Sequence, residues 1–211
     1  MGAFIAFLAL VGGLQKIGGH PSLIRCEYWI YPLQTLVCGA LLLWFWRLYL
    51  LGRPARPGFG AVIGLAVFLI WIAPQTLFGI GPRTAGFDPD LFSNQPALYW
   101  PTVVLRFVRL VVVVPLVEEI FWRGFLLRYL INEEFDQVPI GKFSWFSFVA
   151  VTIAFAAAHS PADWPAALIT GAAYNGVVYR TKSLSTCVIA HALTNLLLGL
   201  WIMHTKQWGF W

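Results

Sequence analysis

Five polar residues that could take part in acid–base chemistry lie inside hydrophobic stretches of this sequence. Glu118 and Glu119 are adjacent, and His159, His191 and Asn195 follow at long intervals. A carboxylate and an imidazole in a low-dielectric cavity can hold a water molecule and take its proton. An imidazole N–H and an amide NH₂ can donate hydrogen bonds to a developing oxyanion. These residue types are therefore candidates for acid–base chemistry in an apolar protein interior.

The two glutamates differ in their relation to Arg123. Glu119 lies four residues before Arg123, so in an α-helix the acid precedes the base on one face, which is the favourable order for an ion pair. Glu118 lies about 100° further around the helix, because each residue turns by 360° over 3.6. We therefore expect Arg123 to neutralise Glu119 while Glu118 faces another helix or a cavity. The spacing leaves open the opposite assignment of the glutamates and a purely structural charge network.

The residues four positions away from each histidine support a shared site for the two histidines. A single buried histidine is more often a core residue whose imidazole bonds to a nearby carbonyl. Here Phe155 precedes His159 by four residues and Asn195 follows His191 by four, so each pair shares a helix face. Because buried polar groups need partners, we expect these residues to meet around one cavity.

The composition indicates an integral membrane protein. Of the 211 residues, 59% are hydrophobic and 11% are charged, and the mean hydropathy is +0.74, whereas soluble domains are about half apolar and a quarter charged. The net charge of +5 comes from Lys and Arg residues spread singly through short loops. It predicts contacts with the lipid bilayer and no binding of nucleic acid. Three cysteines provide no disulfide framework and no metal-ligand spacing.

The hydrophobic stretches predict the elements that position these residues. We expect an all-α, polytopic transmembrane helical bundle of about seven spans, forming one domain over residues 1–211 with a motif-bearing core at about 101–204. A turn over residues 18–27 joins the first two spans, and Pro115 is expected to kink the fourth span one turn before Glu118. The predicted spans are residues 3–17, 28–51, 59–80, 101–131, 142–159, 164–179 and 184–204.

A small excess of Lys and Arg at the loop ends on one side predicts the orientation of the chain in the membrane. The positive-inside rule places the more basic set of loop ends in the cytoplasm, together with the N-terminus. The excess shrinks from three to one if Arg106 and Arg109 are counted with the other set. The more basic set is Arg47, Arg53, Arg56, Arg128, Lys142, Arg180 and Lys182, and the other is Lys16, Arg25, Arg83 and Lys206.

The two histidines lie at different positions along their predicted membrane spans. His159 comes at the far end of its predicted span, whereas His191 comes early in its own. The helices must therefore be tilted, kinked or unequally long for the two side chains to meet.

Three short motifs, in order on successive hydrophobic spans, carry a family resemblance. They are Glu118-Glu119-x-x-x-Arg123, Phe155-x-x-x-His159 and His191-x-x-x-Asn195. Over about residues 111–198 the chain resembles the CAAX prenyl endopeptidase and bacteriocin-processing group of intramembrane proteases (the Abi or CPBP family). Its small size and aromatic-rich front half are similar to the bacterial subgroup associated with exosortase protein-sorting systems.

The resemblance implies an intramembrane endopeptidase that cleaves a membrane-associated protein or peptide in the bacterial inner (plasma) membrane. Glu118 and His159 would activate the water, His191 and Asn195 would form the oxyanion hole, and Glu119 with Arg123 would support Glu118. The family architecture implies no metal cofactor. Whether the substrate is prenylated is left open.

Three other functions are compatible with the same residues. His159, His191 and a glutamate match the two-His, one-carboxylate set of catalytic zinc sites, although no His-Glu-x-x-His motif is present. A transporter or proton-coupled channel also places acids and histidines inside a bundle, but the sequence shows no repeated halves. A non-catalytic binding protein is the third alternative.

Overall fold

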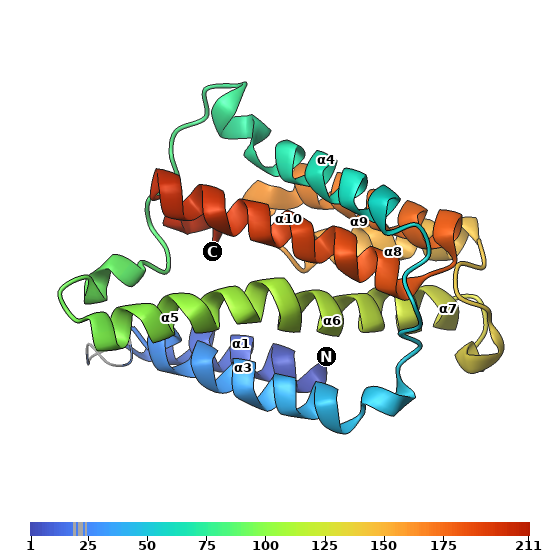
Figure 1. The fold of residues 1–211 in the computed structure, drawn as a ribbon, viewed down its shortest axis with the longest axis horizontal. Helices are drawn as coiled ribbons and strands as arrows, with labels where there is room; N and C mark the ends of the chain where they lie inside the picture. Colours follow the sequence, from blue (N-terminus) through green and yellow to red (C-terminus); the bar gives the residue numbers. More distant parts are fainter. Residues whose placement is uncertain (19, 21–22, 24) are drawn as a thin grey trace. The chain divides into compact units, whose positions relative to one another are not determined.

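The computed structural model describes residues 1–18, 20, 23 and 25–211, in which the regular elements are helical, as predicted. Part of the expected turn over residues 18–27 lies outside the described residues. The chain divides into two compact units, which are described separately (Figure 1). Unit 1 comprises Met1–Arg47, Pro82–Val117 and Gly199–Trp211, and unit 2 comprises Leu48–Gly81 and Glu118–Leu198.

Unit 1 is built on a pair of N-terminal helices. Helices α1 (Gly2–Ile17) and α3 (Glu27–Trp44) pack together through a cluster of Val11, Cys26 and Ile30. The rest of this unit contains α5, the short 3₁₀ turns η2 and η7, and the π-helical segment η3. Their bounds are Pro96–Val108 for α5, Pro89–Phe92 for η2, Trp208–Phe210 for η7 and Arg109–Val113 for η3.

Arg106 and Arg109 are buried inside unit 1, with 3% and 6% of their surface exposed. The Arg109 Nε–H donates to Gln34 Oε1 at 2.7 Å, and the Arg109 guanidinium lies 4.4 Å from the centre of the Tyr31 ring. The Arg106 guanidinium lies 4.9 Å from Tyr31 and 4.7 Å from Phe87. Aromatic faces stabilise desolvated guanidinium groups. These arginines therefore belong to the protein interior and not to a loop.

The predicted fourth span contains two π-helical segments. After α5 and η3 the chain continues through α6 (Val114–Glu119), the π-helical η4 (Ile120–Leu126) and α7 (Leu127–Tyr129). The wide turn of η3, closed by the Val114 N–H donating to the Arg109 carbonyl, comes directly before Pro115. Because proline lacks an N–H and clashes with the carbonyl four residues earlier, a wider turn accommodates it. The distortion expected at Pro115 takes this form.

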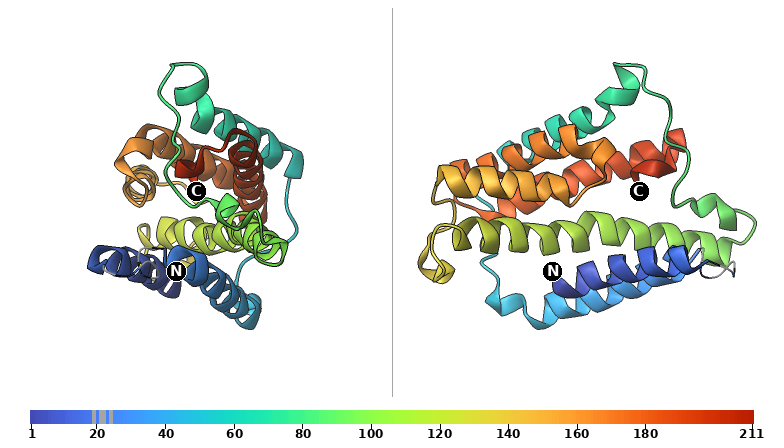
Figure 2. Two further views of the ribbon diagram at one scale, coloured as in Figure 1. Left: turned by 90° about the vertical axis from the view of Figure 1, so that its left-hand side faces the viewer. Right: turned by 180° about the vertical axis from the view of Figure 1, so that it is seen from behind.

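Unit 2 packs α4 (Pro57–Thr76), α8 (Trp145–Ala157) and α9 (Trp164–Thr181) with most of α10 (Leu184–Thr205) (Figures 1 and 2). Helix α9 lies between α4 and α8 and contacts both. Short 3₁₀ turns at Trp46–Leu48 (η1), Phe135–Gln137 (η5) and Pro161–Asp163 (η6) lie in the connections. The core consists of Val67, Tyr174, Val177, Val178, Cys187 and Ala190.

Two glycines set the distance between α4 and α10. A Cβ atom on Gly60 would lie 2.7 Å from the Thr186 carbonyl oxygen, and one on Gly64 would lie 2.5 Å from that of Ala190. Both distances are too short for any side chain. The Gly-x-x-x-Gly spacing, which lets helix backbones approach in membranes, was visible in the sequence and is the signal for this contact.

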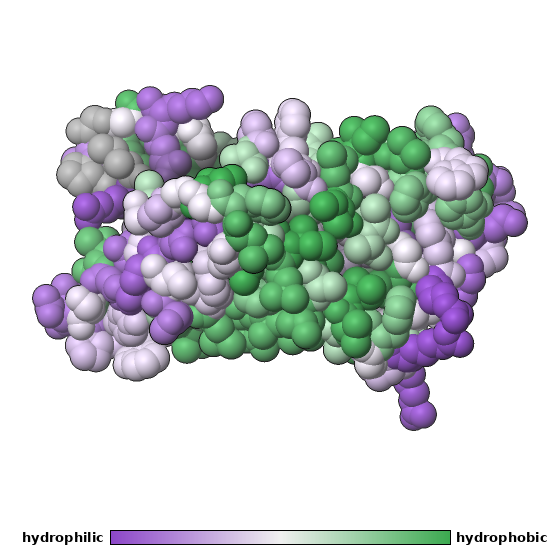
Figure 3. All heavy atoms as spheres, turned by 90° about the horizontal axis from the view of Figure 1, so that it is seen from above, coloured by the Kyte–Doolittle hydropathy of each residue, from purple (hydrophilic) through white to green (hydrophobic). Residues whose placement is uncertain are grey.

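Two described helices, α4 and α10, are long and apolar enough to cross a membrane, while α1 and α8 are shorter apolar helices. Each predicted span contains a helix, but seven crossings are not confirmed. The outer side of α4 exposes apolar residues such as Val62, Leu65 and Leu69. Hydrophobic residues dominate the middle of the face seen in Figure 3.

Candidate active site

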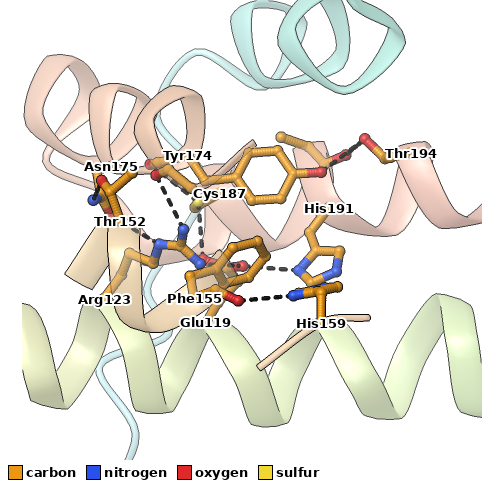
Figure 4. Close-up of polar contacts among 12 residues, drawn as sticks. Glu119, Arg123, Thr152, Phe155, His159, Tyr174, Asn175, Cys187, His191 and Thr194 are labelled. Carbon is orange, nitrogen blue, oxygen red and sulfur yellow. Dashed lines mark hydrogen bonds and ion pairs between the residues drawn. The ribbon is translucent and has the colours of Figure 1, made fainter. Parts of the chain in front are cut away.

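Glu119 is the centre of a buried polar network in unit 2 (Figure 4). Its Oε1 lies 3.1 Å from Arg123 Nη1 and 2.8 Å from His191 Nδ1, and its Oε2 lies 3.0 Å from the Cys187 sulfur. The ion pair predicted from the spacing is therefore present. The contacts with His191 and Cys187 come from α10 and engage both carboxylate oxygens.

Arg123 ties η4 to the neighbouring helices. Its Nε–H donates to Asn175 Oδ1 at 3.0 Å, and its Nη2 donates to the Gly171 carbonyl at 3.2 Å, both on α9. The fully buried Asn175 donates in turn to Thr152 Oγ1 on α8 at 3.1 Å. The Arg123 guanidinium also lies 4.8 Å from the centre of the Phe155 ring. Arg123 thereby holds α8 and α9 around the glutamate.

The contact with Glu119 indicates which ring nitrogen of His191 carries a hydrogen. A carboxylate can only accept, so the His191 Nδ1 carries the hydrogen of the 2.8 Å bond. In the neutral imidazole the Nε2 then has a lone pair, and it becomes a donor only in the imidazolium form. The Tyr174 ring lies 5.2 Å from the His191 ring, and its hydroxyl donates to Thr194 Oγ1 at 2.8 Å. A role for His191 as an oxyanion donor thus requires its charged form, with Glu119 as the counter-ion.

His159 follows the end of α8 and is half-buried. Its Nδ1 lies 2.7 Å from the Phe155 carbonyl oxygen, so Nδ1 donates and Nε2 has a lone pair available to a water molecule. The rings of Phe155 and Trp71 lie 4.7 Å and 5.8 Å from the imidazole. The Trp164 indole N–H donates to the His159 carbonyl at 3.2 Å and fixes the turn.

The length of α8 accounts for the difference in depth between the histidines. Its 13 residues span about 20 Å, less than the roughly 30 Å of a bilayer core. Helix α10 has 22 residues. His159 therefore lies inside the span of the longer helices, which corresponds to the unequal lengths that the sequence required.

Some of the candidate residues are in direct contact with one another, whereas others lie close to these residues along the chain. Direct contacts join Glu119 to Arg123 and His191, and the Phe155 ring touches both Arg123 and His159. Glu118, next to Glu119 at the end of α6, and Asn195, one turn after His191 on α10, are half-buried. Within the described residues, Glu118 makes no hydrogen bond to either histidine.

Cys187 is the residue of this network that sequence reasoning missed. It is buried, and the sequence did not predict its contact with Glu119. The available signal was its position four residues before His191, which places both side chains on one face of α10.

The zinc alternative does not fit this arrangement. Among the residues that the structure describes, no three His, Cys, Asp or Glu side chains are arranged so that they could hold a metal ion, although Glu119 contacts both His191 and Cys187. Glu119 and His191 also direct the atoms that would ligate a metal toward each other.

Comparison with known families agrees with the position of this network. Residues 100–197 match the family model described as type II CAAX prenyl endopeptidase Rce1-like. The match covers 98 of the 211 residues, and this segment is similar to the Rce1-like family. This family consists of integral membrane proteases that act on proteins or peptides, which confirms the predicted enzyme class. The Rce1-like segment contains Glu119, Arg123 and His191 together with their partners on α8 and α9. No curated protein and no solved structure matches the chain.

Proposed function

We propose that the Glu119 network, together with the half-buried Glu118, His159 and Asn195, forms the active centre of a metal-independent intramembrane endopeptidase. The observation that carries this proposal is the full engagement of Glu119 by Arg123, His191 and Cys187. A carboxylate with both oxygens occupied is a poor base for water. The adjacent, half-buried Glu118 is the better candidate.

In this proposal Glu118 and His159 position the attacking water. The Nε2 lone pair of His159 accepts a hydrogen bond from the water, and Glu118 takes the proton as the oxygen attacks the scissile carbonyl. His191, as imidazolium, and Asn195 stabilise the resulting oxyanion. Glu118 then returns the proton to the leaving amine, which completes hydrolysis with no net change in the enzyme. Glu119 and Arg123 position the helix and compensate the charge of His191.

The substrate in this proposal is a membrane-associated protein or peptide in the bacterial inner membrane. The whole chain is proposed to act as one integral membrane domain. Membership of the subgroup associated with exosortase sorting systems rests on the small size and the aromatic-rich front half, and it stays a prediction.

The two glutamates provide the sharpest test. Purified wild type, Glu118→Gln and Glu119→Gln are incubated in detergent with a membrane-anchored peptide library, each with and without a strong zinc chelator. Cleavage is followed by mass spectrometry and folding by thermal unfolding. We expect Glu118→Gln to keep its unfolding temperature and lose cleavage, Glu119→Gln to lose both, and the chelator to have no effect.

Other outcomes would point to specific alternatives. Full activity in folded Glu118→Gln would contradict the assignment of the base. Activity lost on chelation and restored by zinc would move the same residues to a metal site. Absence of cleavage in the wild type would favour the transporter or binding alternatives, which a flux assay distinguishes.

A further inference from the structure

The connections of unit 2 at one end of its helices are joined by hydrogen bonds. The Ala55 N–H donates to Ser183 Oγ at 3.4 Å, and Ser185 Oγ donates to the Gly52 carbonyl at 2.6 Å. Lys182 Nζ donates to the Gly141 carbonyl. The chain before α4, the chain before α8 and the turn between α9 and α10 therefore lie together. We call this the basic end.

The basic end contains the exposed positive charge of unit 2. Five exposed residues lie in these connections or in the adjoining last turn of α9, and they are Arg53, Arg56, Lys142, Arg180 and Lys182. The opposite connections, residues 77–81 and 158–163, contain no Lys or Arg. By the positive-inside rule the basic end is cytoplasmic. Burial of Arg106 and Arg109 in unit 1 removes the two charges that obscured this assignment.

His159 lies toward the opposite end. The ring of Trp71 on α4 is 5.8 Å from the His159 ring, and the Trp71 indole N–H donates to Thr170 on α9 at 2.9 Å. Trp71 comes 14 residues after Pro57, the first residue of α4, which places it about 21 Å from the basic end in a bilayer core of about 30 Å. His159 is therefore in the half of the membrane that faces away from the cytoplasm.

Packing closes the approach from the basic end. Val177, Val178 and Leu184, which lie between the Glu119 network and that end, are at most 2% exposed. A cavity of about 360 Å³ does open there, but none of the candidate catalytic residues lines it. In contrast, Glu118, His159 and Asn195 are only half-buried.

We propose that the catalytic site is reached from the non-cytoplasmic face, and that the substrate is a membrane-anchored protein whose scissile bond lies at that face. This inference rests on the proposed function for its substrate class, but its sidedness rests on charge and packing alone. It separates this chain from an enzyme that trims C-termini exposed in the cytoplasm.

Cysteine labelling tests the sidedness without any substrate. The native Cys26, Cys38 and Cys187 are buried, so labelling of a single introduced cysteine can be distinguished from labelling of the native cysteines. Ala162→Cys places a thiol in the exposed turn after His159, and Glu133→Cys places one in an exposed loop at the basic end. Cells expressing each variant are treated with a membrane-impermeant maleimide, intact or permeabilised, and total thiol is measured after unfolding in SDS.

We expect Ala162→Cys to react in intact cells and Glu133→Cys only after permeabilisation. The reverse pattern, or reaction of both variants in intact cells, would overturn the proposal, whether or not the protein is a protease.

The substrate class has its own measurement. New protein N-termini are compared in membranes of cells with wild type or Glu118→Gln. Termini lost in the variant should map to non-cytoplasmic segments of membrane-anchored proteins. Cytoplasmic termini would overturn the substrate class. An unchanged set would also overturn it and would count against proteolysis itself, while the labelling result would stand.

Discussion

At the scale of residues, the buried charges of Glu119 and Arg123 depend on each other. Both side chains are fully buried, and their remaining polar atoms bond to α9 and α10. Removing one member of such a pair leaves an uncompensated charge in the interior, which is more costly than the loss of the hydrogen bond alone.

We therefore expect Arg123→Met to destabilise the folded protein by about 3–5 kcal/mol. The measurement is denaturant unfolding in mild detergent, with Arg180→Met as the control because Arg180 is an exposed arginine on α9. The control should unfold like the wild type. Equal stability of Arg123→Met and wild type would show that Glu119 finds another partner or is neutral.

The sequence predicted this pair because the partners lie on one helix, four residues apart. It did not predict that His191 and Cys187, about 70 residues later, would contact the same carboxylate. Spacing along the chain says which side chains share a helix face, but contacts between helices depend on the packing angle and on the depth of each helix.

At the scale of elements, α4 contributes no candidate catalytic residue but positions the helix that does. Gly60 and Gly64 bring its backbone against Thr186 and Ala190 of α10, and Ala190 precedes His191. In addition, Thr194 Oγ1 on α10 lies 2.8 Å from the Gly64 carbonyl oxygen. The position of His191 therefore depends on this helix contact.

Gly64→Ala should push α4 away from α10, because its methyl group would meet a backbone carbonyl. We expect a loss of about 1–3 kcal/mol in stability and a lower cleavage rate at unchanged substrate concentration. Gly58→Ala is the matched control, since a Cβ there meets nothing within 4 Å. It should be neutral or slightly stabilising, because alanine favours a helix over glycine. Equal effects of both changes would argue against the close packing.

Element types were predicted well, because hydrophobic stretches separated by Gly, Pro and charged residues determine where helices run. The local geometry was predicted less well. The π-helical turns around Pro115 and Arg123 and the shortness of α8 depend on packing against neighbouring helices. Periodicity within one stretch of sequence contains no information on such contacts.

At the scale of the whole molecule, the chain exposes large apolar side chains on several helices. Examples are Leu36 on α3, Val62 on α4, Val104 on α5 and Ile153 on α8. Such surfaces are rare on soluble proteins and mark contact with lipid or another protein. Together with the two span-capable helices they support the membrane location of the family.

The corresponding prediction concerns membrane fractions. After washing with alkaline carbonate, which releases peripheral proteins, the chain should stay in the pellet, and it should enter the supernatant only with detergent. A peripheral membrane protein of the same cells is the control. Release by carbonate alone would contradict integral insertion.

The number of crossings is a feature that composition alone does not determine, and seven stays a prediction. Hydropathy identifies apolar stretches, but a helix of 13 or 16 residues, such as α8 or α1, spans less than a bilayer core of about 30 Å. An apolar stretch of this chain therefore need not cross the whole membrane.

The contact of Gly60 and Gly64 with α10 has a consequence for how far the enzyme extends. The recognisable sequence covers residues 100–197, and α4 precedes it entirely. A protein cut to that segment would lose the helix that supports the backbone on either side of His191. We therefore expect the smallest active form of the enzyme to be larger than the segment that matches the family model. Gly60 and Gly64 take no part in the reaction. Their substitution is nevertheless constrained during evolution, because any side chain at either position would collide with the backbone of α10.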